Sequence, residues 1–111
     1  MDRYSIFNKF NGRCAYCGCE LSSIRDMQVD HVVPKFCNGT DNYDNMFPAC
    51  CICNNFKRSF TVEEFRDQLL NQVAVLQRNS TVFRRLLKYD LVRLTQKNIV
   101  FYFEKKENTC Y

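Results

Sequence analysis

Two pairs of cysteines with the spacing C-x-x-C constrain the fold of this chain more than any other feature. The first pair is Cys14 and Cys17, and the second pair is Cys50 and Cys53. Two such pairs can bring four thiolates within tetrahedral reach of one Zn²⁺ ion. The chain has 111 residues, the length of one small domain, so a shared ion would join two distant points of it. We therefore predict a structural zinc site formed by these four cysteines.

Other roles for the cysteines have to be weighed against zinc binding. The chain contains eight cysteines, and an even number is also compatible with a disulfide framework in a secreted protein. No signal peptide is recognisable after Asp2 and Arg3, and no segment approaches the ~18 apolar residues of a membrane helix. We therefore expect a cytoplasmic protein without membrane association, whose thiols stay reduced. Cys19 and Cys51 lie next to predicted ligands and could replace them.

The segment between the two pairs is long enough to form structure of its own. Residues 18–49, which number 32, separate Cys17 from Cys50, and a compact zinc ribbon has only ~15–20. Four patterns follow in order: a β-branched strand at 27–33, a polar loop at 37–45, a short strand at 46–49 and a helix at 53–59. A strand, loop, strand and helix are thus expected, with the two cysteine pairs holding the ends together.

The rest of the chain is predicted to be mainly helical. Thr61 to Glu64 matches a capping box, and apolar side chains then recur at helical spacing to about Gln77. A further helix is predicted near 82–89. Residues 91–95 and 99–103 flank a short polar turn and favour a terminal β-hairpin.

These elements predict an α+β fold in a single domain. We assign residues 1–111 to that domain, with a zinc-stapled core at 12–59 and a helical and hairpin extension at 60–111. The role of this extension is not evident from its sequence.

His31 is the only histidine in the chain, and it follows Asp30 inside the predicted insert. Consecutive side chains on a regular strand point to opposite faces, so a bend near Pro34 would be needed for both to approach one ion. Asn54 directly follows Cys53, so a zinc site would fix its position as well. Hydrolysis of a phosphodiester needs a base that titrates near neutral pH, and it needs positive charge beside the phosphate.

The order of these residues resembles the HNH endonuclease family, which has a ββα-metal fold. The shared pattern is C-x2-C, Asp-His-x2-Pro, Asn-Gly and Asn-x4-Cys-x2-Cys-Asn-x2-Lys. It covers roughly residues 12–58 and is carried here by Cys14, Cys17, Asp30, His31, Pro34, Asn38, Gly39, Asn45, Cys50, Cys53, Asn54 and Lys57.

The resemblance implies a role for each motif residue. His31 would be the general base, Asp30 and Asn54 would hold one Mg²⁺ or Mn²⁺ ion, and Asn45 would tie the loop to the strands. The four cysteines would hold a structural Zn²⁺ ion away from the chemistry. Many family members have histidine at the position of Asn54, so this chain is an H-N-N variant, and an amide oxygen suits a hard ion.

The resemblance also implies a nucleic-acid partner, with DNA expected and RNA not excluded. The net charge of +4 permits such a partner without requiring it. Lys57, Arg58, Lys35 and Arg13 are the candidate phosphate contacts. A monomer that nicks and a homodimer that cuts both strands both remain open, and the resemblance suggests a bacterial or viral context.

The main alternative is a non-catalytic zinc module that binds nucleic acid or protein. Such a module has no need of Asp30, His31 and Asn54 together, so the intact set favours the enzyme. A thiol hydrolase is disfavoured because its best cysteines would be zinc ligands.

Overall fold

The computed structural model describes residues 2–95 and 97–109. They divide into two compact units, one formed by the chain up to Phe65 with the chain from Val100 onward, and one formed by residues 66–99. The predicted extension at 60–111 is therefore not one unit, because its last segment belongs with the core.

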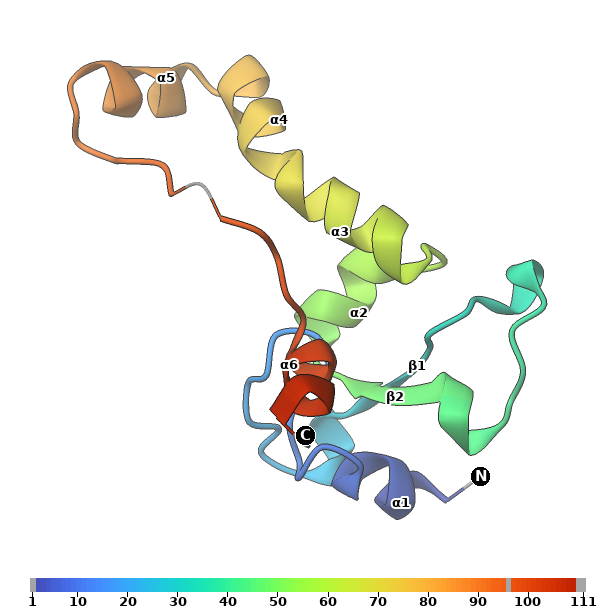
Figure 1. The fold of residues 1–111 in the computed structure, drawn as a ribbon. Coiled ribbons are helices and arrows are strands. Elements are labelled where there is room, and N and C mark those ends of the chain that lie inside the picture. Colours follow the sequence, from blue (N-terminus) through green and yellow to red (C-terminus); the bar gives the residue numbers. More distant parts are fainter. Residues whose placement is uncertain (1, 96, 110–111) are drawn as a thin grey trace. The chain divides into compact units, whose positions relative to one another are not determined.

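The centre of the first unit is a ββα arrangement, shown in Figure 1. β1 (Gln28–His31) pairs antiparallel with β2 (Met46–Ala49), and His31 lies opposite Met46 in the register. α2 (Cys51–Lys57) follows directly, and the Cys50 thiol at its N-cap accepts a hydrogen bond from the backbone amide of Cys53. Both predicted strands and the helix are confirmed. The helix begins two residues earlier than expected because Cys50 supplies the cap.

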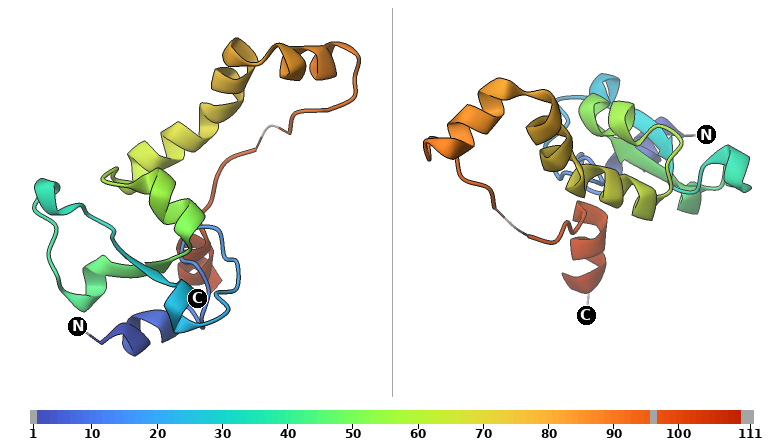
Figure 2. Two further views of the ribbon diagram at one scale, coloured as in Figure 1. Left: turned by 180° about the vertical axis from the view of Figure 1, so that it is seen from behind. Right: turned by 90° about the horizontal axis from the view of Figure 1, so that it is seen from above.

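Short elements enclose this centre. α1 (Arg3–Asn8) contributes Ile6 to a small apolar core with Leu21, Met27 and Met46. Three 3₁₀ turns lie at Ile24–Asp26, Lys35–Cys37 and Tyr43–Asn45. In both views of Figure 2, α2 stays beside β1 and β2, in agreement with their contacts.

The predicted terminal hairpin is wrong. Residues 91–95 form no strand, and residues 102–109 form the helix α6 (Tyr102–Thr109). The Glu104 side chain accepts a hydrogen bond from the Phe101 amide at 2.8 Å, as a capping glutamate does at the start of a helix. The Phe101 ring stacks on Phe65 with centroids 5.1 Å apart, and it also stacks on Phe103. The aromatic residues of this segment therefore pack in an aromatic cluster and do not form a strand.

α6 lies against the first cysteine pair. The Tyr102 amide donates to the Tyr16 carbonyl at 2.9 Å, and the Phe103 amide donates to the Ala15 carbonyl at 2.8 Å. Gly18 has φ +79°, and an added Cβ would lie 2.9 Å from Tyr102 Cδ1. Glycine is therefore required there both by the backbone turn and by the close approach of α6.

The remaining helices are α3 (Val62–Leu70), α4 (Gln72–Asn79) and α5 (Thr81–Lys88). The predicted capping box is present, since the Thr61 amide donates to Glu64 and the Glu64 amide donates to the Thr61 hydroxyl. The helix expected to reach Gln77 is interrupted at Asn71, a residue type whose side chain competes with helical hydrogen bonds. None of the described helices combines the length and apolar character needed to cross a membrane.

Candidate functional site

Four cysteine thiols meet where the loop after α1 approaches the start of α2. The Sγ atoms of Cys14, Cys17, Cys50 and Cys53 all lie within 4.8 Å of one another. The Cys17 and Cys50 sulfurs are 3.9 Å apart. Zn–S bonds of about 2.3 Å in a tetrahedron place sulfurs about 3.8 Å apart, so the cluster has the size that Zn²⁺ requires. The seven cysteines that the structure describes are free thiols, which does not support a disulfide framework among them.

The electrostatics of the cluster call for a cation. Burial raises the pKa of the Cys17 thiol, and a hydrogen bond to Cys14 together with burial raises that of Cys53. The hydrogen bond from Cys53 lowers the pKa of Cys14 to about 4. Without a positive ion the cluster therefore does not carry four thiolates. The backbone amide of Tyr16 donates a hydrogen bond to the Cys14 sulfur and that of Cys53 donates to the Cys50 sulfur, which stabilises negative charge on these two sulfurs.

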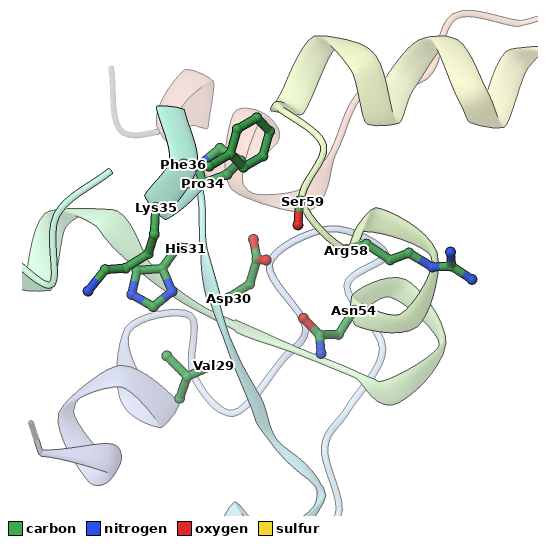
Figure 3. Close-up of a pocket in the computed structure, with 9 residues that line it drawn as sticks. All are labelled: Val29, Asp30, His31, Pro34, Lys35, Phe36, Asn54, Arg58 and Ser59. Carbon is green, nitrogen blue, oxygen red and sulfur yellow. The ribbon is translucent and has the colours of Figure 1, made fainter. Parts of the chain in front are cut away.

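A pocket of about 390 Å³ lies beside β1 and the end of α2. Asp30, His31 and Asn54 line it, so the structure brings together the three residues on which the predicted chemistry depends. Figure 3 shows these side chains, which reach the pocket from two elements. The other lining residues are Val29, Pro34, Lys35, Phe36, Arg58 and Ser59.

The Asp30 carboxylate is held in place on one side only. It is 4% exposed, and its Oδ2 accepts a hydrogen bond from the Tyr16 hydroxyl and forms an ion pair with Lys57 Nζ at 2.9 Å. Burial and the Asp30 charge raise the pKa of Tyr16 well above its ordinary range, so the phenol stays protonated and donates. Oδ1 makes no hydrogen bond within the described residues and is the oxygen left for a ligand.

The structure does not support the prediction that Lys57 contacts a phosphate. Its side chain is fully buried, and its ammonium group also donates to the His31 carbonyl at 3.2 Å and the Val32 carbonyl at 3.4 Å. A buried ammonium with these partners is not available to solvent or to nucleic acid. Lys57 instead balances the charge of Asp30 and fixes the end of β1.

Asn54 completes a pair of oxygen donors. Figure 3 shows its side chain extending from α2 toward the Asp30 carboxylate, whereas His31 lies on the other side of β1. The side-chain amide of Asn54 makes no hydrogen bond within the part of the chain that the structure describes, whereas its backbone amide donates to the Cys50 carbonyl. Carboxylate and amide oxygens are the ligands that Mg²⁺ and Mn²⁺ prefer. The bend expected to bring Asp30 and His31 to one ion is not needed, because Asn54 supplies the second donor.

His31 has a partner that the sequence did not reveal. Its Nε2 lies 2.8 Å from Asp41 Oδ1, and Lys35 Nζ lies 2.7 Å from Asp41 Oδ2. Hydrogen bonds from Lys35 and His31 lower the pKa of the Asp41 carboxyl below its ordinary value, so it is an ionised acceptor near neutral pH. Asp41 is one of several acidic and amide residues in a polar loop, and nothing in its spacing marks it out.

Asn45 ties that loop to the strands, as expected for it. Its Oδ1 accepts from the Val33 amide at 2.8 Å, and its Nδ2 donates to the Val33 and Thr40 carbonyls at 3.0 and 2.8 Å. A Cβ at Gly39 would lie 1.7 Å from the Val33 carbonyl oxygen, so glycine allows the loop to close. The loop carries Asp41, and these contacts therefore position the partner of His31.

The other candidate phosphate contacts are placed differently from one another. Arg58 and Lys35 line the pocket. Arg13 does not line it, because it lies in the cysteine loop and forms an ion pair with Glu20 at 3.1 Å.

The helix of this ββα unit starts in a four-thiol cluster that could hold a metal ion. Its first strand carries Asp30 and His31, and its helix carries Asn54, which together define a ββα domain with a candidate metal centre. Residues 14–60 match the family model described as HNH endonuclease. This segment is therefore an HNH endonuclease domain, as the sequence pattern predicted.

Two curated relatives agree with this assignment. YoqL, an SPbeta prophage-derived protein of Bacillus subtilis whose name assigns it to the HNH endonucleases, is 32% identical over 66 residues, covering 50% of this chain and 27% of the relative. The CRISPR-associated endonuclease Cas9 of Corynebacterium diphtheriae is 34% identical over 56 residues, covering 50% of this chain and 5% of the relative. The chain thus spans about a quarter or less of each relative's length. No solved structure matches the chain.

The cysteine cluster predicts that substitutions of Cys53 and Cys51 differ sharply in their effect on metal binding. Cys53→Ser should abolish binding of one zinc ion per chain and unfold the cysteine loop, because structural zinc contributes ~10–16 kcal/mol in small domains. Cys51→Ser changes an exposed thiol outside the cluster and should keep the metal. Metal content by mass spectrometry and thermal melting would check this. Equal zinc content in both variants would contradict the assigned ligand set.

The buried ion pair predicts that Lys57 acts on stability. Lys57→Met should destabilise the fold by about 3–5 kcal/mol, because it leaves the Asp30 carboxylate buried without its counter-charge. Arg58→Met, at the next position but on an exposed side chain, should change stability by no more than ~0.5 kcal/mol. Urea unfolding of both variants would measure this. If the Lys57→Met protein has wild-type stability and weakened DNA binding, the prediction that Lys57 contacts a phosphate is correct after all.

Proposed function

We propose that this chain is a metal-dependent endonuclease that hydrolyses phosphodiester bonds of DNA, with His31 as the general base. The observation that carries the proposal is one pocket lined by a histidine and by two oxygen donors that have no protein partner on the pocket side. A zinc module that only binds nucleic acid would not need this arrangement.

The hydrogen bond of His31 assigns a role to each ring nitrogen. A carboxylate can only accept, so Nε2 carries the proton in the contact with Asp41, and the lone pair lies on Nδ1. Nδ1 makes no hydrogen bond within the described residues. We infer that Nδ1 takes a proton from the attacking water. The new O–P bond then forms as the bond to the 3′ oxygen breaks, and the leaving oxygen takes a proton from solvent water, which gives a 5′-phosphate and a 3′-hydroxyl.

Asp30 and Asn54 would hold the catalytic Mg²⁺ or Mn²⁺ ion. When bound, the ion supplies positive charge beside the scissile phosphate and the leaving oxygen. Lys57 already balances the charge of Asp30, so the two protein ligands bring little net negative charge. We therefore expect weak ion binding by the protein alone, in keeping with the habit of Mg²⁺ to bind through one or two protein ligands together with substrate phosphates.

The surroundings of the pocket support a nucleic-acid substrate. Arg58 and Lys35 are exposed cations on its lining and are the proposed phosphate contacts, with Arg13 as a more remote one. The proposed location is the cytoplasm of a bacterium, with the protein encoded by the bacterium or by a virus that infects it. The thiolates of the zinc site persist in that reducing compartment, and the named relatives are bacterial.

The base is tested by relaxation of supercoiled plasmid with Mg²⁺ or Mn²⁺. His31→Ala should lower the cleavage rate by ~10²–10⁴-fold, the usual contribution of a positioned base. Zinc content and circular dichroism should remain those of the wild type. The ratio of nicked to linear product reports whether one strand or both are cut. A folded His31→Ala protein that cleaves at the wild-type rate would sink the assignment, and wild-type protein inert on DNA and RNA would favour the binding module.

The orientation of the base is tested at Asp41. Asp41→Asn should lower the rate by roughly 10–10²-fold, part of the ~10²–10⁴-fold effect of the base, because the charge that orients the imidazole is lost. Asp44→Asn, an exposed acid in the same region, is the matched control. A folded Asp41→Asn protein that cleaves at the wild-type rate would show that Asp41 does not orient His31.

A further inference from the structure

The charge of this protein is divided unequally between its two compact units. Residues 66–99, here called the helical arm, contain seven basic and two acidic side chains, a net charge of +5. The remainder contains nine basic and ten acidic side chains, a net charge of −1. Four thiolates with one Zn²⁺ ion would add −2 to that remainder. The unit that holds the proposed cleavage site therefore has no net attraction for a polyanion, whereas the arm has a strong one.

One helix of the arm presents its cations on a single face. At the helical spacing, Arg84, Arg85 and Lys88 share one side of α5, and the apolar residues Val82, Phe83, Leu86 and Leu87 share the other. α5 contains no acidic residue. α5 contacts α4, and Phe83, Leu86 and Leu87 on its apolar side are half-buried. The basic side is the one presented to solvent.

The cations of the arm differ in what they already bind. Arg84 donates to the Gln77 and Arg78 carbonyls at 2.6 and 2.9 Å, so it closes the end of α4. Arg93 is neutralised by Asp90 at 2.7 Å. Arg78, Arg85 and Lys88 are exposed and form no ion pair within the residues that the structure describes. These three are available to phosphates without breaking an existing contact.

The arm is attached to the rest of the chain at both of its ends. Phe65 and Phe101, which flank it in sequence, stack on each other within the first unit. Inside the arm, the Arg66 guanidinium donates to the Ile99 carbonyl, so its two ends are also held together. A basic segment tethered in this way acts at high effective concentration on nucleic acid bound by its neighbour.

We propose that the helical arm is a nucleic-acid backbone clamp, in which Arg85 and Lys88 of α5, with Arg78, bind phosphates of the strand or duplex that the site cleaves. The proposal rests on the proposed nuclease function for the identity of the partner. Phosphate contacts of this kind carry no sequence information, so the arm contributes affinity for any sequence. It also explains why a catalytic unit with a net negative charge can engage DNA.

The test measures binding without cleavage. Arg85→Gln/Lys88→Gln is compared with Arg25→Gln/Lys105→Gln, which removes the same charge from exposed positions of the first unit. Both pairs are placed in the His31→Ala background, and anisotropy of a short labelled duplex of random sequence is followed over a salt series. The plot of log K against log salt should become less steep by about 1.8 when two phosphate contacts are lost. Between 50 and 200 mM salt, the α5 pair should then lose roughly tenfold less affinity than the protein with the arm intact.

Each outcome decides the proposal separately from the nuclease activity. If the salt dependence of DNA binding is less steep in the α5 pair and unchanged in the control pair, the arm binds phosphates as proposed, whether or not the wild type cleaves plasmid. Equal slopes in the two pairs overturn it, even if the wild type is an active nuclease. If the α5 pair leaves DNA binding intact and Val82→Gln alters the sedimenting mass, the arm is a protein interface and the proposal fails.

Discussion

The buried charge of Asp30 is the constraint on which the site depends. One oxygen of this carboxylate is satisfied by the Tyr16 hydroxyl from the cysteine loop and by the Lys57 ammonium from α2. A buried carboxylate is costly unless its partners are fixed, so the loop, β1 and α2 must keep their relative positions. The other oxygen is thereby aimed at the pocket without a partner of its own. The contacts of one oxygen of Asp30 therefore leave the other oxygen free to face the pocket.

The cysteine cluster extends this constraint to the rest of the first unit. Tyr16 lies between Cys14 and Cys17 in sequence, so the geometry of the cluster sets where the phenol lies. The rings of Phe65 and Phe101 approach the Tyr16 ring with centroids 5.4 Å away in each case. A metal at the cluster would therefore influence the position of Asp30 through Tyr16, although no cysteine lines the pocket. Support of this kind, from residues that orient a ligand without binding the ion, is common in metal enzymes.

The sequence was most informative where chemistry demands a fixed spacing. A metal or a base needs particular residue types in a particular order, and this order predicted that the four cysteines cluster and that Asp30, His31 and Asn54 lie at one site, as the thiol cluster and the pocket lining now have them. The roles of these residues stay predictions. Asp41 was missed because a polar loop contains many acids, and only folding brings one of them to His31. Lys57 was found for the wrong reason, since a basic residue after a motif predicts a phosphate contact as readily as a buried counter-charge. The hairpin at the end of the chain was wrong because the apolar run of 99–103 reads as a strand, whereas Glu104 caps a helix there.

The aromatic cluster around Tyr16 also orders events during synthesis of the chain. The cysteines, Asp30, His31, Asn54 and Lys57 all leave the ribosome before the helical arm does, yet Phe101 and Phe103 are contributed after it. A nascent chain that has reached only the arm has an Asp30 whose phenol partner lacks two of its neighbouring rings. The basic arm is therefore synthesised before the rings that complete the surroundings of the Tyr16 phenol.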